Sequence, residues 1–88
     1  MTTVEQRLER VILDLADARG PAKSICPSEA ARAVGGEEWR DLMDQARAVA
    51  RQLAARGRVV LTSRGRELSP SEEWRGPIRI RTTAAGQP

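Results

Sequence analysis

The sequence predicts a mostly helical α+β domain in which three helices precede a β-hairpin. Two long segments, 4–19 and 37–56, carry apolar residues at the three- and four-residue spacing of a helix face. Near the end of the chain, residues 78–81 alternate isoleucine with arginine, which is the period of a half-buried strand. With 88 residues, of which 40% are apolar, the chain can build one domain with a modest core.

The first helix is expected over residues 4–19. Residues 3–6 have the Thr-x-x-Gln pattern of a capping box, and the Gly-Pro pair at 20–21 ends the apolar repeat. Leu13 falls opposite the apolar stripe when successive residues are placed 100° apart. Two interpretations of Leu13 stay open. The favoured one is an isolated exposed side chain, and the other is that Leu13 belongs to a dimer face.

A short helix over 27–34 and a long helix over 37–56 are expected next. Pro27 suits the first position of a helix, which places Cys26 at the N-cap. The preceding residues 23–25 can form a brief strand. The long helix carries a continuous apolar stripe, which predicts that one side of it faces the core.

The two tryptophans are expected to play different parts. Trp39 belongs to the apolar stripe of the long helix, so we expect it in the core. Trp74 falls in the loop of the hairpin, where it either folds back as an anchor or projects to stack on a base or a partner. The anchor is favoured, because most tryptophans are substantially buried.

The hairpin is expected to pair residues 58–62 with 78–81. The first segment is rich in β-branched residues, a glycine-containing turn follows at 63–66, and the isoleucines of the second segment face inward. Helix, short strand, short helix, long helix and hairpin follow in the order of a winged helix-turn-helix domain, with the hairpin as the wing. The alternative is a three-helix domain with an unrelated hairpin.

One domain is expected over residues 1–82, followed by a flexible tail over 83–88. No stretch is apolar enough to span a membrane, and the first residues lack the pattern of a signal peptide. The single cysteine fits a reducing compartment. We therefore expect a cytoplasmic protein that has no membrane partner.

Several stretches in combination carry a family resemblance. They are the segment 20–29 with its Cys-Pro-Ser-Glu end, Trp39, the segment 57–62 with its Gly-Arg-Val-Val start, and the Arg-Gly-Pro-Ile-Arg-Ile-Arg run at 75–81. Together they resemble a bacterial family catalogued as domain of unknown function 3253, over about residues 3–82. The resemblance implies a winged-helix fold. It implies no activity, substrate or site residue.

Composition excludes most catalytic chemistry. The chain has no His, so the commonest general base and the commonest metal ligand are absent. Neither a GxGxxG nor a GxxxxGK[ST] motif occurs, and one cysteine builds neither a zinc cluster nor an internal disulfide. We expect a protein that is not an enzyme and that uses no cofactor or metal.

Cys26 allows two interpretations. A thiol at a helix N-terminus, with Lys23 nearby, is a possible redox site, because both features stabilise a thiolate. No second cysteine is present to resolve an oxidised form. The favoured interpretation is structural, since a free cysteine commonly packs as a small hydrophobic residue.

Charge is unevenly distributed along the chain, which has a net charge of +3. Residues 37–46 carry four acids and one Arg, whereas residues 47–66 carry six Arg and no acid. A run of this kind is typical of a surface that contacts a polyanion, although many charge runs are only a solvated face. The candidate phosphate ligands are Arg40, Arg47, Arg51, Arg58, Arg64 and Arg66.

The expected function is nucleic-acid binding through phosphate contacts from the wing and the C-terminal half of the long helix. The acids at the start of that helix repel phosphates, which argues against base readout in the usual way. The alternative is a protein-interaction module that does not bind nucleic acid and uses the wing or this acidic segment as its contact surface. The oligomeric state is left open.

Overall fold

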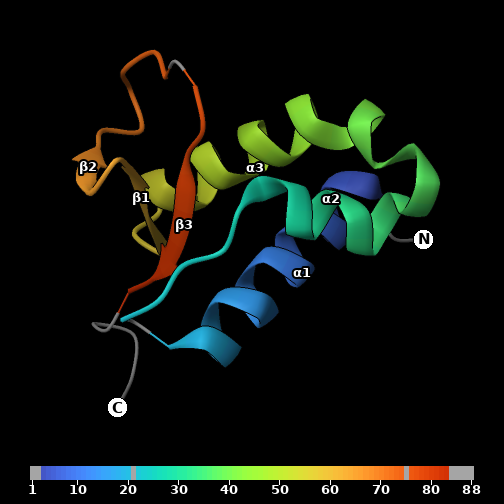
Figure 1. Cartoon of the computed structure of the whole chain (residues 1–88), viewed down its shortest axis with the longest axis horizontal. Coiled ribbons are helices and arrows are strands. Elements are labelled where there is room, and N and C mark those ends of the chain that lie inside the picture. The colour runs from blue at the N-terminus through green and yellow to red at the C-terminus, as the bar shows by residue number, and fades with distance from the viewer. Residues whose placement is uncertain (1–2, 21, 75, 84–88) are drawn as a thin grey trace.

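The computed structural model describes residues 3–20, 22–74 and 76–83. These residues form an α+β fold that is mostly helical, as the sequence predicts (Figure 1). In chain order the elements are α1 (Val4–Arg19), α2 (Pro27–Gly35), the 3₁₀ segment η1 (Gly36–Leu42), α3 (Met43–Ala55), β1 (Val59–Ser63), β2 (Arg66–Leu68) and β3 (Arg79–Thr82).

The strands form an antiparallel sheet in the order β2-β1-β3. Leu61, at the centre of β1, pairs with Leu68 of β2 on one side and with Ile80 of β3 on the other. Ile80 also exchanges two backbone hydrogen bonds of 2.8 Å with Ile25. The brief strand predicted over 23–25 is therefore a single bridge at the free edge of β3.

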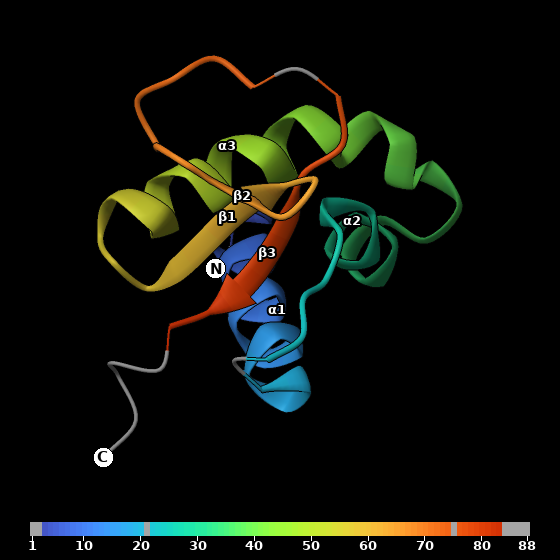
Figure 2. The same ribbon diagram turned by 60° about the vertical axis from the view of Figure 1, so that its left-hand side comes forward.

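The helices cover one face of this sheet. α1 packs against β3 and α3 against β1, and the strands lie in front of both helices in Figure 2. The largest fully buried side chains come from every layer: Leu8, Ile12, Ile25, Leu53, Leu61, Ile78 and Ile80. The two isoleucines beside and within β3 thus face the core, as their period-two spacing predicts.

α1 begins and ends where the sequence predicts. The hydroxyl of Thr3 accepts a hydrogen bond from the backbone N–H of Gln6 at 3.1 Å, and the Gln6 side chain accepts one from the Thr3 N–H at 3.0 Å. Gly20 ends the helix with a φ of 81°, which favours glycine. Leu13 is half-buried and packs against the core, which corrects the expectation of an exposed side chain.

The single long helix predicted over 37–56 is wrong at its start. Gly36–Leu42 form a 3₁₀ segment, and Glu38 leaves the helical region with φ −96° and ψ 21°. The cause is tertiary packing: Leu42 Cδ1 lies only 2.7 Å from where a Cβ on Gly35 would stand. The glycine therefore lets η1 fold tightly onto α2, and this contact overrides the local helical pattern.

The hairpin is also connected differently from the prediction. β1 and β3 pair as expected, with Val60 opposite Arg81. The turn predicted at 63–66, however, joins β1 to β2, a strand that was not predicted. β2 has three residues and a single buried side chain, Leu68, so it offers no alternation to detect.

The end of the chain is described only in part. Of the tail predicted over 83–88, Thr83 donates a hydrogen bond from its hydroxyl to the Gly57 carbonyl oxygen at 3.2 Å. Residues 84–88 lie outside the described residues. None of the described helices is both long enough and apolar enough to cross a bilayer.

Candidate nucleic-acid interface

The structure distributes the six predicted phosphate ligands over three places. Arg40 lies on η1, Arg47 and Arg51 lie on α3, and Arg58, Arg64 and Arg66 lie on or beside the β1–β2 hairpin. Arg40 therefore lies on a different element from Arg47 and Arg51, because η1 and α3 are not the one continuous helix predicted over 37–56.

Arg51 is engaged within the molecule. Its Nη1 donates to the carbonyl oxygens of Pro70 at 2.5 Å and of Glu72 at 2.9 Å. Its guanidinium carbon lies 4.0 Å from the centroid of the Trp74 ring, within the range of a cation–π interaction. Arg51 therefore holds the loop 69–74 against α3 and is a positioning residue.

Arg47 and Trp74 complete this attachment. Arg47 Nη1 donates to the Gly76 carbonyl oxygen at 3.2 Å, and Trp74 Nε1 donates to the Ser69 carbonyl oxygen at 3.1 Å. Trp74 is half-buried and packs against the core. It folds back over the domain, which confirms the expectation of an anchor.

Arg64 and Arg66 stand at the tip of the β1–β2 hairpin. Arg64 and Gly65 form its turn with φ of 53° and 80°, and both arginines are exposed. Arg66 Nη2 lies 3.2 Å from Oε1 of Glu72, but the Arg66 side chain remains 75% exposed. An ion pair this exposed contributes little stability, so Arg66 can turn to another anion at small cost.

An open groove of about 710 Å³ separates the hairpin tip from the loop 69–74. Both Arg64 and Arg66 line it, but so do Glu72 and Glu73. The carboxylates make the groove itself a poor phosphate site. Phosphate contacts fit the outward-facing ends of the arginines better.

Arg40 takes part in a different cluster. The guanidinium carbons of Arg32 and Arg40 lie 4.4 and 4.5 Å from the centroid of the Trp39 ring. Trp39 is half-buried and packs against the core, so it lies at the edge of the core and not at its centre. The reason is the 3₁₀ geometry of η1, which sets Trp39 beside Arg32 of α2.

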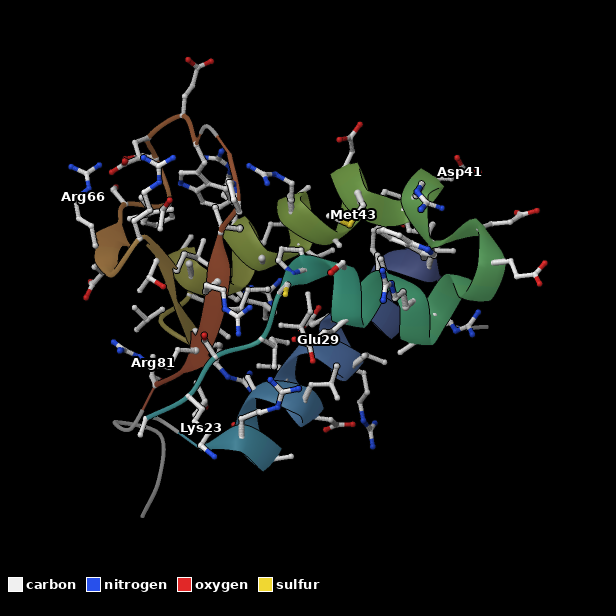
Figure 3. The ribbon with its side chains drawn as sticks, in the orientation of Figure 1. Lys23, Glu29, Asp41, Met43, Arg66 and Arg81 are labelled. Carbon is white, nitrogen blue, oxygen red and sulfur yellow. The ribbon has the colours of Figure 1, made fainter. Side chains whose placement is uncertain are left out.

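A second group of cations, which was not predicted from the sequence, lies on the outer face of the sheet. Alternation along β3 turns Arg79 and Arg81 away from the core. Figure 3 shows Arg81 and Lys23 on the side of the molecule that bears the sheet, far from Asp41 of η1. The Ile-Arg-Ile-Arg pattern carried this signal, because inward isoleucines require outward arginines.

Arg79 is fixed on the segment that precedes α2. Its Nε donates to Ser24 Oγ at 2.8 Å, its Nη2 to the Ser24 carbonyl oxygen at 2.9 Å, and its Nη1 to Cys26 Sγ at 3.0 Å. Arg19 donates to the same Ser24 carbonyl at 2.9 Å and forms an ion pair with Glu29. Two arginines therefore fasten this segment to the sheet and to α1.

Cys26 lies at the N-cap of α2, as predicted. Its backbone N–H donates to Glu29 Oε2 at 2.9 Å. Partial burial acts to raise the pKa of Glu29, but this hydrogen bond and the nearby Arg19 outweigh burial and lower that pKa from its ordinary value. These contacts fit the favoured structural interpretation of Cys26, and the redox interpretation stays the alternative.

Within residues 3–20, 22–74 and 76–83, no three His, Cys, Asp or Glu residues gather in a way that could hold a metal ion. The described residues define a small α+β domain with helices on one face of a three-stranded antiparallel sheet. Over residues 5–83 the sequence matches the family described as "Protein of unknown function (DUF3253)", and the chain belongs to that family. The comparison with curated proteins found no significant match.

Proposed function

We propose that this protein is a winged helix-turn-helix domain that binds nucleic acid through phosphate contacts and performs no catalysis. The order of elements supports the fold: α1, the bridge at Ile25, α2, α3, β1 and β3. The β1–β2 hairpin and the loop 69–74 then correspond to the wing. Because one fold serves many functions, the proposal depends on the residues of the site.

The pair of Arg64 and Arg66 at the tip of the wing carries this proposal. Both are exposed, and the hairpin that bears them is attached to α3 through Arg51 and the loop 69–74. An attached wing loses less conformational freedom on binding than a mobile one. The arginine side chain also presents a planar set of donors that matches a phosphate.

α3 supports binding indirectly. Arg51 donates to carbonyl oxygens of the loop 69–74, and Arg47 donates to the Gly76 carbonyl oxygen, so both are engaged within the protein instead of standing free for a phosphate. The acids near the start of α3 remain unfavourable for entry into a groove of nucleic acid. Phosphate contacts therefore come mainly from the wing, and sequence discrimination is weak.

Fluorescence anisotropy with a labelled random-sequence duplex, at low and at physiological salt, tests this function. With two to four phosphates neutralised, the slope of log affinity against log salt is expected between roughly −2 and −4. The variant Arg64→Glu/Arg66→Glu should stay folded and lose at least about tenfold in affinity, since each lost phosphate contact removes part of the electrostatic free energy.

The matched control is Arg7→Glu/Arg10→Glu, which makes the same charge change on the exposed side of α1. Its duplex affinity should be within about threefold of that of the wild type, because salt screens charges that lie far from the bound phosphates. Wild-type protein without low-salt affinity for duplex or single-stranded DNA or RNA would overturn the proposal.

A protein-interaction module is the second candidate function. One observation favours it: two of the six predicted phosphate ligands already donate to the protein's own carbonyl oxygens, Arg47 to that of Gly76 and Arg51 to that of Pro70. The acidic residues of η1 would then form the contact surface. The same titration separates the two functions, because this candidate requires that no nucleic acid binds even at low salt.

A further inference from the structure

The outer face of the sheet carries cations that the wing-tip contacts leave unused. We propose that a nucleic-acid duplex extends from the wing across this face, where Lys23, Arg58, Arg79 and Arg81 bind its phosphates. This inference depends on the proposed function and specifies both the surface and the form of the nucleic acid.

The register of the strands places Arg79 and Arg81 on the outer face of the sheet. Val60 pairs with Arg81, and Thr62 with Arg79, so the four side chains share the face that points away from α1 and α3. Val60 and Thr62 are half-exposed, while their neighbours Val59 and Leu61 on the inner face are buried. The outer face is therefore accessible to a partner.

Two further cations, Lys23 and Arg58, flank this face at the end where β1 begins and β3 ends. Lys23 is exposed on the segment that runs beside β3, two residues before the buried Ile25, so it lies at the edge of this face. Arg58 is exposed and directly precedes β1, two residues before Val60, so it continues the outward alternation.

The face is continuous with the wing. β1 has five residues, Val59–Ser63, so the six residue steps from Arg58 to the turn at Arg64 span about 20 Å. One strand of a duplex carries about six phosphates over that length. A duplex lying along β1 can thus meet cations at both ends of the strand.

Acidic side chains on this face are few and partly neutralised. Glu67 of β2, opposite Thr62, is exposed at the wing end. Glu29 is paired with Arg19. The acids of η1 lie elsewhere, as the position of Asp41 in Figure 3 indicates, so a duplex on the sheet avoids the repulsion that it meets at the start of α3.

Arg79 is held in place by internal hydrogen bonds, but it is exposed, whereas the engaged Arg47 and Arg51 are half-buried. Three of its N–H groups donate to Ser24 and Cys26, and a guanidinium has five, so two remain for a ligand. A cation held in place in this way loses little rotamer freedom on binding.

The chemistry of the face favours a duplex over a single strand. Proteins that bind single strands usually stack the unpaired bases on aromatic side chains. The centre of this face has Val60 and Thr62 instead, and Trp74 is covered on one side by Arg51. In a duplex the bases already stack on one another, so cations that reach phosphates are sufficient.

The variant Lys23→Glu/Arg81→Glu tests the surface, because both side chains are exposed or half-exposed and neither bonds another side chain within the described residues. Its duplex affinity, measured by anisotropy, should fall at least about fivefold, and its salt slope should weaken by about 1 to 2, the amount for one or two lost phosphates. The control Arg7→Glu/Arg10→Glu should change neither quantity. Circular dichroism should show that all variants fold.

Three outcomes separate this inference from the proposed function. If Arg64→Glu/Arg66→Glu loses duplex affinity while Lys23→Glu/Arg81→Glu binds like the control, the duplex does not contact the sheet, and the proposal of binding through the wing stands. If a single strand of equal length binds more tightly than the duplex, the form of the ligand is wrong. If the wild type binds no nucleic acid at all, the proposed function fails and this inference fails with it.

Discussion

Arg51 lies over the ring of Trp74, with its guanidinium carbon 4.0 Å from the ring centroid. The same guanidinium donates to the carbonyl oxygens of Pro70 and Glu72. One side chain of α3 therefore binds both the backbone and the aromatic ring of the loop that follows β2. This attachment fixes the position of the hairpin relative to the helices.

Removing the Arg51 guanidinium should loosen that loop. Arg51→Ala loses two hydrogen bonds and a cation–π contact, so we expect a loss of about 2 kcal/mol in the free energy of unfolding. Arg51→Lys should recover little, because lysine lacks the planar donor set. Thermal unfolding measures both variants, with Arg58→Ala as the control. An unchanged midpoint for Arg51→Ala would show that the loop is held by other contacts.

The elements that depend on local signals were predictable from the sequence. The bounds of α1 follow from its capping box and from Gly20, and α2 begins at Pro27 as expected. The pairing of β1 with β3 also follows, because alternation marks which side of a strand is buried.

The predictions that were wrong concern contacts between segments that are distant in the sequence. The break before α3 arises because Leu42 packs onto Gly35, and no helical periodicity reports such a contact. The attachment of the loop by Arg51 joins residues that are far apart in sequence. The cluster of arginines in the sequence therefore predicts a cationic surface. It does not predict which arginines donate to the protein's own carbonyl oxygens.

The place of Trp39 changes the expected cost of removing it. Truncation of a fully buried tryptophan to alanine lowers the free energy of unfolding by about 3–5 kcal/mol. Trp39 is half-buried beside Arg32 and Arg40, so Trp39→Ala should cost about 2 kcal/mol, from lost packing and two cation–π contacts. Urea unfolding measures this value, with Leu53→Ala as the fully buried reference. A larger loss for Trp39→Ala than for Leu53→Ala would contradict this ranking.

Glu29 should make stability depend on pH in the acid range. Its pKa in the folded protein is lowered from an ordinary value of 4.5, against the effect of burial, by the Cys26 N–H and by Arg19. A lowered folded pKa adds stability above the unfolded pKa, and this contribution disappears as pH falls through the folded value. The protein should therefore lose stability below about pH 4.5 as this carboxylate is protonated.

The variant Glu29→Gln isolates that contribution. Its unfolding midpoint should fall less than that of the wild type between pH 6 and pH 3, because the glutamine does not titrate. Glu37→Gln, which neutralises an exposed carboxylate on η1, is the matched control and should follow the wild type. Parallel curves for Glu29→Gln and the wild type would show that the contacts of Glu29 contribute nothing to the acid dependence.

Charge reversal on η1 distinguishes binding through the wing and sheet from entry of α3 into a groove. Glu37 and Glu38 are exposed, and η1, the green segment after α2, lies at the end of the molecule opposite the strands in Figure 1. The domain extends 31 Å along its longest axis, whereas charges are screened over about 8 Å at physiological salt. If the duplex contacts the wing and sheet, Glu37→Lys/Glu38→Lys should raise duplex affinity less than about threefold at that salt. A gain of tenfold or more, measured by anisotropy beside the wild type, would place the start of α3 in the interface, because only charges within the screening length act so strongly on a phosphate.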